Sequence, residues 1–147
     1  MKFKEDTMKY SNATNYALHT MIHLLRLPKG SMIGVQKLAE MQKLSPTYLS
    51  KILTKLAKGG LIGSTPGVNG GYQVLKPKDK ISFLDVIKAI EGDSNLFTCS
   101  FHHNEGCLIE NVMLTAEENM NNELENKLLI DIANKADEQC RNHEHEV

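Results

Sequence analysis

Residues 45–75, SPTYLSKILTKLAKGGLIGSTPGVNGGYQVL, decide the fold of this chain. Ser45 can cap a helix, and Pro46 suits the first helical position because its missing N–H has no intrahelical partner there. Apolar side chains then recur at helical spacing until two glycines end the helix after Lys58. Two strand-like runs, 61–65 and 72–75, follow around a glycine-rich tip. A capped helix followed by such a hairpin is the second half of a winged helix-turn-helix.

The segments on either side of this stretch complete that pattern. Apolar spacing predicts helices over residues 14–27 and 35–41, with a short extended piece at 32–33 between them. After the hairpin, Ser82 and Asp85 form a capping-box pattern that predicts a helix ending near Gly92. The predicted fold is therefore mainly α with a small β wing, and residues 8–92 form a winged helix-turn-helix DNA-binding domain.

The C-terminal part of the chain has a different character. Residues 93–107 form a polar, cysteine-containing loop, and residues 108–139 are predicted to be one long dimerisation helix. Its apolar side chains recur at steps of three and four: Met113, Ala116, Met120, Leu124, Leu128 and Ile132. So long a stripe cannot all face residues 8–92, which favours a homodimer, although the helix could also fold back on its own domain.

Charge is divided unevenly along the chain. Residues 9–80 hold 11 Lys and Arg against two acids, a net charge of +9, whereas residues 81–147 hold four against 14, a net charge of −10. Such asymmetry points to a nucleic-acid or membrane partner. No run approaches the roughly 20 apolar residues of a membrane-spanning helix, and the charged N-terminus lacks a signal-peptide pattern. We expect a cytoplasmic protein that binds double-stranded DNA and no membrane.

The predicted recognition helix and wing supply the candidate DNA contacts. A helix fits the major groove, where its hydroxyls and lysines reach base edges and phosphates, and glycines let the wing backbone lie close to the sugar-phosphate chain. The alternative is an ordinary solvated helix face with a plain connecting hairpin. The candidates are Lys37, Ser45, Thr47, Tyr48, Ser50, Lys51, Lys55, Thr65, Gly67, Asn69, Gly70 and Gly71.

Several short segments stand in a fixed order along the chain: Tyr10-Ser11, Tyr16-Ala17-Leu18, Leu38-Ala39, 45–53, Gly60-Leu61-Ile62, Gly67, Gly70-Gly71-Tyr72, Ile81-Ser82 and Ile90-Glu91-Gly92. In this order they resemble the Rrf2-type winged helix-turn-helix transcriptional regulators, a family of iron–sulfur, nitric-oxide and redox-responsive repressors. The resemblance covers residues 8–135 and implies a homodimer with crossing C-terminal helices that binds an inverted-repeat operator. Many members carry an arginine just before the wing glycine, where this chain has Pro66, so Thr65 and Asn69 take a larger part or the wing contacts only phosphate.

The same resemblance places a sensing function at Cys99 and Cys107. Cluster-bearing relatives hold a third cysteine where this chain has Met113, and an Asp ligand where it has Asn15. A thioether is a poor replacement for a thiolate on iron. No cofactor is firmly predicted, although an iron–sulfur cluster or zinc at Cys99 and Cys107 is conceivable.

Three interpretations of these cysteines stay open. They form a thiol switch, they bind a metal or an altered cluster together with His102 and His103, or they are structural residues without a sensing role. His19 and His23, one helical turn apart, either pair on a metal or form a polar helix face.

Two other classes of function are disfavoured by the sequence. A thiol redox enzyme would need a Cys-x-x-Cys or a βαβ pattern, and neither is present. A winged helix used only for protein docking has no reason to carry a charge of +9. The sequence therefore predicts a non-enzymatic homodimeric repressor that responds to redox or nitrosative stress through Cys99 and Cys107. The alternative is a regulator that has no cluster or is controlled by a protein partner, and in which these cysteines are structural.

Overall fold

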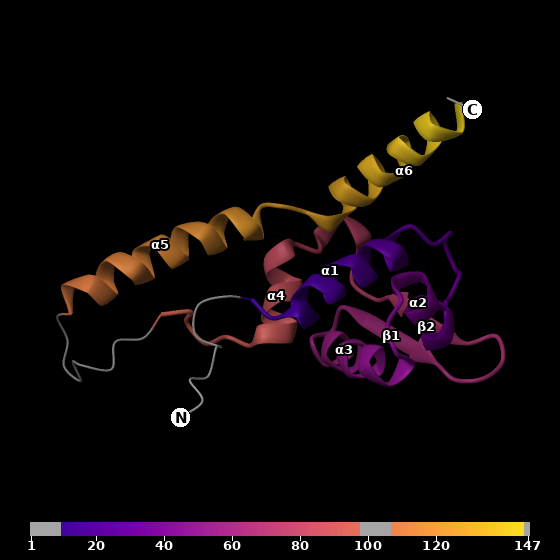
Figure 1. Cartoon of the computed structure of the whole chain (residues 1–147), viewed down its shortest axis with the longest axis horizontal. Coiled ribbons are helices and arrows are strands. Elements are labelled where there is room, and N and C mark those ends of the chain that lie inside the picture. The colour runs from indigo at the N-terminus through magenta and orange to yellow at the C-terminus, as the bar shows by residue number, and fades with distance from the viewer. Residues whose placement is uncertain (1–9, 98–106, 146–147) are drawn as a thin grey trace.

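The structure, a computed structural model, describes the backbone of residues 10–97 and 107–145 and the side chains as far as Asp137. Figure 1 shows α1 to α4 and a hairpin gathered in one body, from which α5 and the far end of α6 project on opposite sides. The elements are α1 (Asn12–Leu25), α2 (Val35–Gln42), α3 (Pro46–Lys58), β1 (Ile62–Thr65), β2 (Gly71–Val74), η1 (Lys78–Lys80), α4 (Phe83–Glu91), α5 (Leu108–Glu125) and α6 (Leu129–His145).

The core lies where α1, α2, α3 and α4 meet the hairpin. α3 contributes a buried stripe of four side chains at helical spacing, Leu49, Ile52, Leu53 and Leu56. α1 places Ala17, Met21, Leu24 and Leu25 against them, and α2 adds Leu38 and Ala39. The winged helix-turn-helix with a small β wing is confirmed.

The turn between α2 and α3 depends on an unusual backbone conformation. Lys43 caps the C-terminus of α2 with φ 56° and ψ 43°, in the left-handed region that non-glycine residues seldom adopt. Leu44 N–H then donates to the Ala39 carbonyl at 2.9 Å, which closes the turn. As predicted, Ser45 caps α3, because its Oγ accepts a hydrogen bond from Tyr48 N–H at 3.1 Å. The two caps fix the direction in which α3 leaves α2.

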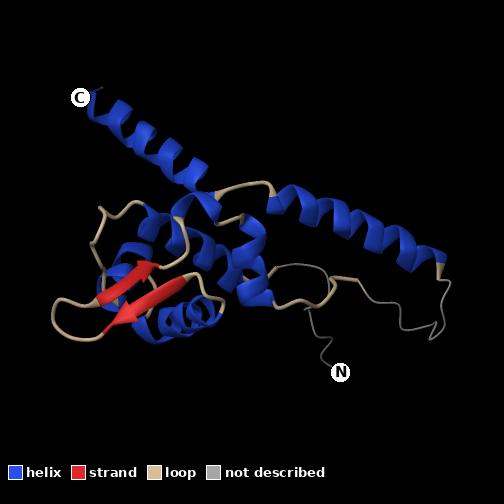
Figure 2. Ribbon diagram, turned by 180° about the vertical axis from the view of Figure 1, so that it is seen from behind, coloured by secondary structure: helices blue, strands red, loops and turns tan. Residues whose placement is uncertain are grey.

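The wing is an antiparallel hairpin with one additional pairing. Ile62 pairs with Val74 and Thr65 with Gly71. Figure 2 shows the two strands side by side from behind. The predicted extended piece at 32–33 joins this sheet, since Tyr72 N–H donates to the Ile33 carbonyl at 2.8 Å and Ile33 N–H returns a bond at 3.2 Å. This pairing anchors the wing to the body beside α2.

Side chains at both ends of α4 make capping hydrogen bonds. The predicted capping box is present: Ser82 Oγ accepts from Asp85 N–H at 3.1 Å, and Asp85 accepts from Ser82 N–H at 3.0 Å. Burial alone raises the pKa of Asp85, but the bonds from Ser82 and an ion pair with Lys76 at 3.1 Å outweigh it and lower that pKa. At the other end, Glu91 Oε1 accepts from the N–H and Oγ of Ser11 at 2.7 and 2.8 Å and from Thr14 Oγ1 at 2.6 Å. Glu91 thus caps the start of α1, where Ser11 makes no side-chain cap of its own.

The prediction of one continuous helix over residues 108–139 is wrong. The structure divides this range into α5 and α6, and α6 continues to His145. The break occurs because the chain pairs with the start of α4: Phe83 N–H donates to the Lys127 carbonyl and Leu129 N–H to the Ile81 carbonyl, both at 2.9 Å. Leu129 and, one turn on, Ala133 are thereby buried in the core. The expected stripe through Leu128 and Ile132 is displaced by one residue.

Candidate nucleic-acid interface

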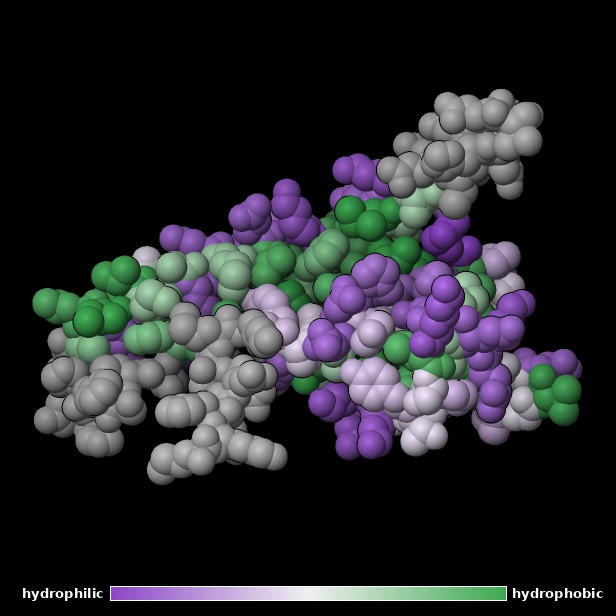
Figure 3. Space-filling model, in the orientation of Figure 1, coloured by the Kyte–Doolittle hydropathy of each residue, from purple (hydrophilic) through white to green (hydrophobic). Residues whose placement is uncertain are grey.

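The exposed side of α3 presents a stripe of hydroxyls and lysines. At about 100° per residue, Thr47, Lys51, Thr54 and Lys58 fall on one line opposite the buried leucines, and all four are exposed. Figure 3 shows hydrophilic residues (purple) and residues of intermediate hydropathy (white) over much of the body that carries α3. Hydroxyls and cations in one line on a rigid helix can read base edges and bind phosphates.

Other residues in or next to α3 that are predicted to contact DNA also make contacts within the protein. Ser45 uses its oxygen to cap the helix, and Tyr48 packs edge-to-face on Tyr16 of α1 with ring centroids 5.9 Å apart. Lys55 lies close enough to Glu91 to lower the pKa of that carboxyl, although burial of Glu91 acts in the opposite direction and hydrogen bonds contribute more. These residues flank the stripe, and Ser50 lies half-buried at its other edge. Lys37 is exposed on α2.

The wing exposes its predicted contacts but uses two glycines for folding. Thr65, Gly67 and Asn69 are exposed. A Cβ on Gly70 would lie 1.9 Å from the Thr65 carbonyl oxygen, and one on Gly71 would lie 2.6 Å from the Ile33 backbone. Gly71 also has φ 143°, a conformation that favours glycine. Both glycines are therefore required to close the wing, whatever they contact outside it.

The helical period of α3 also predicts Thr54 and Lys58 on its exposed face, and the sequence offers Lys43 and Lys58 as further phosphate contacts, whereas one residue of the wing tip is not among the sequence candidates. Val68 at the wing tip is fully exposed. Its position follows from the turn in which Gly70 N–H donates to the Gly67 carbonyl at 3.1 Å, and no sequence signal marks an apolar residue for this position.

The predicted sensing residues are only partly within the described structure. Cys99, His102 and His103 lie outside the described residues. Cys107 is half-buried and caps α5, its Sγ accepting from Glu110 N–H at 3.4 Å. Within residues 10–97 and 107–137, no group of three or more His, Cys, Asp or Glu side chains can hold a metal. Met113 and Asn15 stand at the two positions where the family resemblance implies ligands, and a thioether and a neutral amide are poor replacements there for a thiolate and a carboxylate on iron.

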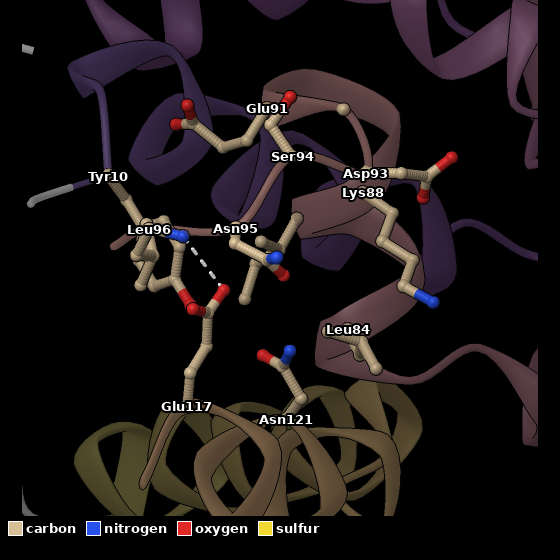
Figure 4. A pocket seen from close by; sticks show the side chains of 12 residues that line it. Tyr10, Leu84, Lys88, Glu91, Asp93, Ser94, Asn95, Leu96, Glu117 and Asn121 are labelled. Atoms are coloured by element: carbon tan, nitrogen blue, oxygen red, sulfur yellow. Dashed lines mark hydrogen bonds between the residues drawn. The ribbon is translucent and has the colours of Figure 1, made fainter. Parts of the chain in front are cut away.

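A pocket lies where the predicted sensor loop leaves the DNA-binding domain. Figure 4 shows Tyr10, Glu91 and Glu117 around it, between α4 and α5. Glu117 Oε1 accepts from Leu96 N–H at 2.9 Å and so ties the beginning of the loop to α5. Burial, with the charges of Glu117 and Glu91, raises the pKa of Tyr10, which is therefore neutral at physiological pH. The pocket thus joins the segment just before α1, α4, the beginning of the loop and α5.

The α1 histidines His19 and His23 do not line this pocket. Partial burial, followed by the charges of Arg26 and His19, lowers the pKa of His23. The structure does not bring this pair to Cys107, because they line a separate cavity with Met41 and Gln42 of α2. Among the described residues, no helix is long and apolar enough to cross a membrane.

Comparison with known proteins agrees with this geometry. A family model, Rrf2, described as an iron-dependent transcriptional regulator, matches residues 10–135. The HTH-type transcriptional regulator YffB of Lactococcus lactis is 41% identical over 90 residues, which cover 61% of this chain and 58% of that protein.

Two solved structures have the same fold. The global cysteine regulator CymR of Bacillus subtilis superposes with a TM-score of 0.74 at 24% identity, covering 87% of this chain and 98% of that one. The oxidised form of Staphylococcus aureus CymR superposes with a TM-score of 0.70 at 30% identity, covering 86% and 96%. The family and these relatives are regulators rather than enzymes.

Proposed function

Because the chain belongs to the Rrf2 family of transcriptional regulators, we propose that it binds an inverted-repeat operator as a homodimer and represses transcription. The observation that carries this proposal is the exposed stripe of Thr47, Lys51, Thr54 and Lys58 on the capped helix α3. We assign α3 to the major groove, and the wing residues Thr65, Gly67 and Asn69 to the adjacent backbone.

Dimerisation is assigned to α5. None of its described side chains is buried, and near its start Leu108, Ile109 and Val112 are 78%, 70% and 67% exposed. Figure 3 shows this apolar surface in green at the end of the projecting helix. A second copy related by two-fold symmetry would cover the same side chains on both chains. It would also bring two α3 helices to successive half-sites of an operator.

We propose that Cys99 and Cys107 make operator binding sensitive to oxidation. Cys107 caps α5, so oxidation of its sulfur changes the start of the helix assigned to the dimer. A solved structure of the S. aureus relative is of an oxidised form. The alternative is that Cys107 is only a structural cap and that a protein partner or a small molecule controls the regulator.

Replacement of Lys51 by Ala should weaken operator and random DNA alike, because a phosphate contact carries no sequence information. In a dimer two contacts are lost, so we expect about tenfold weaker binding and a salt slope smaller by about 2. Fluorescence anisotropy over a salt series measures both values. Lys88→Ala, at an exposed lysine of α4, is the matched control, and an equal loss in both variants would contradict the assignment of α3.

Replacement of Cys107 by Ser separates the sensing and structural interpretations, because a serine oxygen can still cap α5. We expect reduced parent and variant to bind operator equally. After peroxide or a nitric-oxide donor, the parent should lose about fivefold or more in affinity, within the usual range of allosteric coupling, while Cys107→Ser and Cys99→Ser respond less. If all three respond alike, the cysteines are not the sensor.

A further inference from the structure

A cavity between α1 and α2 brings together nitrogen and oxygen donors that the proposed function does not use. It is lined by Asn15, Tyr16, His19, His23, Met41 and Gln42. His19 and His23 are four residues apart on α1, so their imidazoles lie one above the other on the same helix face. His19 is exposed and His23 is half-buried, which leaves both rings open to the cavity.

The hydrogen bond of His19 fixes which ring nitrogen is available. Nδ1 lies 2.8 Å from the Asn15 carbonyl oxygen. A carbonyl can only accept, so Nδ1 carries the proton in this bond and Nε2 of the neutral ring keeps its lone pair. A backbone carbonyl that orients one imidazole nitrogen in this way is the usual outer-shell arrangement of a metal-binding histidine.

Gln42 adds an oxygen that lacks a partner. Its Nε2 donates to Thr20 Oγ1 at 2.8 Å, which orients the amide, while Oε1 is buried and, among the described residues, accepts no hydrogen bond. A buried acceptor without a partner is costly and requires an explanation. A bound cation at the same cavity would provide one.

We propose that His19 and His23, with the Gln42 amide oxygen, bind a divalent transition-metal ion of the zinc type. Two imidazoles favour zinc, nickel or copper over magnesium or calcium, and solvent completes the coordination of an open site. No acidic or thiol side chain lines the cavity, so the site is weaker than a structural zinc centre. Tyr16 lines it too and packs on Tyr48 of α3, which places the metal beside the recognition helix.

The test uses the full chain with Cys99, Cys107 and Cys140 replaced by Ser, because thiolates would compete for zinc. Zinc chloride is added without DNA, and the histidine ring nitrogens are followed by long-range proton–nitrogen NMR. We expect one equivalent to move the His19 and His23 signals together, with coordination at Nε2 of His19. If zinc binds to the protein but the His19 and His23 signals do not move, the metal lies elsewhere and the proposal is wrong. Because no DNA is present, this result is independent of the proposed function.

Substitutions supply a second readout. Removing a residue that only hydrogen-bonds to a metal ligand already lowers metal affinity about 10–100-fold. Removing a ligand itself, as in His19→Asn or His23→Asn, should therefore weaken zinc binding at least about tenfold. His143→Asn is the matched control for the removal of one histidine, and circular dichroism checks that each variant folds. If both α1 variants bind zinc as tightly as the control, the site is not at this cavity.

Discussion

Replacement of Ile109 by Asp should convert the protein from a dimer to a monomer of 16.5 kDa. Ile109 is 70% exposed in the single chain and lies between Leu108 and Val112 on the projecting helix α5. If a second copy covers this surface, the substitution buries a carboxylate twice, once on each side of the two-fold axis, and such a charge has no partner there. Sedimentation or light scattering at micromolar concentration measures the mass.

Operator binding should fall together with the dimer. Linking two recognition helices raises the affinity for DNA roughly 10²–10⁴-fold over that of one helix, because the second helix binds at a high effective concentration. The monomer should therefore bind the full operator at least about 100-fold more weakly. Asn111→Asp is the matched control, because it adds the same charge two residues away on a different side of α5, where Asn111 is exposed. If the Ile109→Asp variant stays dimeric, the interface lies elsewhere.

Local signals were enough to predict most of the DNA-binding domain. Ser45 with Pro46, and Ser82 with Asp85, act within three or four residues, and the structure confirms both caps. The period of α3 likewise predicted its buried and exposed sides. The roles of Gly70 and Gly71 were less accessible, because they depend on contacts with the Thr65 and Ile33 backbones that only the folded wing creates.

The break between α5 and α6 could not be predicted from local sequence. Residues 126–128, Asn-Lys-Leu, contain neither proline nor glycine, and the helical period continues across them. The chain leaves the helix there because its backbone pairs with Ile81 and Phe83, more than 40 residues earlier. For the same reason the sequence did not reveal that Glu91 caps α1, since Ser11 is 80 residues away.

That distant cap makes Glu91 a major determinant of stability. One carboxylate oxygen accepts three hydrogen bonds, two from Ser11 and one from Thr14, and Thr14 is buried. In Glu91→Ala the first turn of α1 loses its acceptor and the Thr14 hydroxyl loses its partner. Losing a charged acceptor costs about 1.5–3 kcal/mol, and losing an N-cap about 0.5–2 kcal/mol. Since the two costs overlap, we expect the free energy of unfolding to fall by about 2–3 kcal/mol.

Urea unfolding of Glu91→Ala, Glu91→Gln and the control Glu118→Ala, an exposed acid of α5, measures this cost. The pKa of Glu91 is raised by burial but lowered more strongly by its hydrogen bonds and by the Lys55 charge, so the net shift is downward. A lowered folded-state pKa gives stability that is complete above the unfolded value of about 4.3 and disappears as the pH falls through the folded value. The difference between the parent and Glu91→Gln should therefore be constant from neutral pH down to about 5 and shrink below 4. A difference that does not change with pH would show that the charge of Glu91 contributes nothing to the cap.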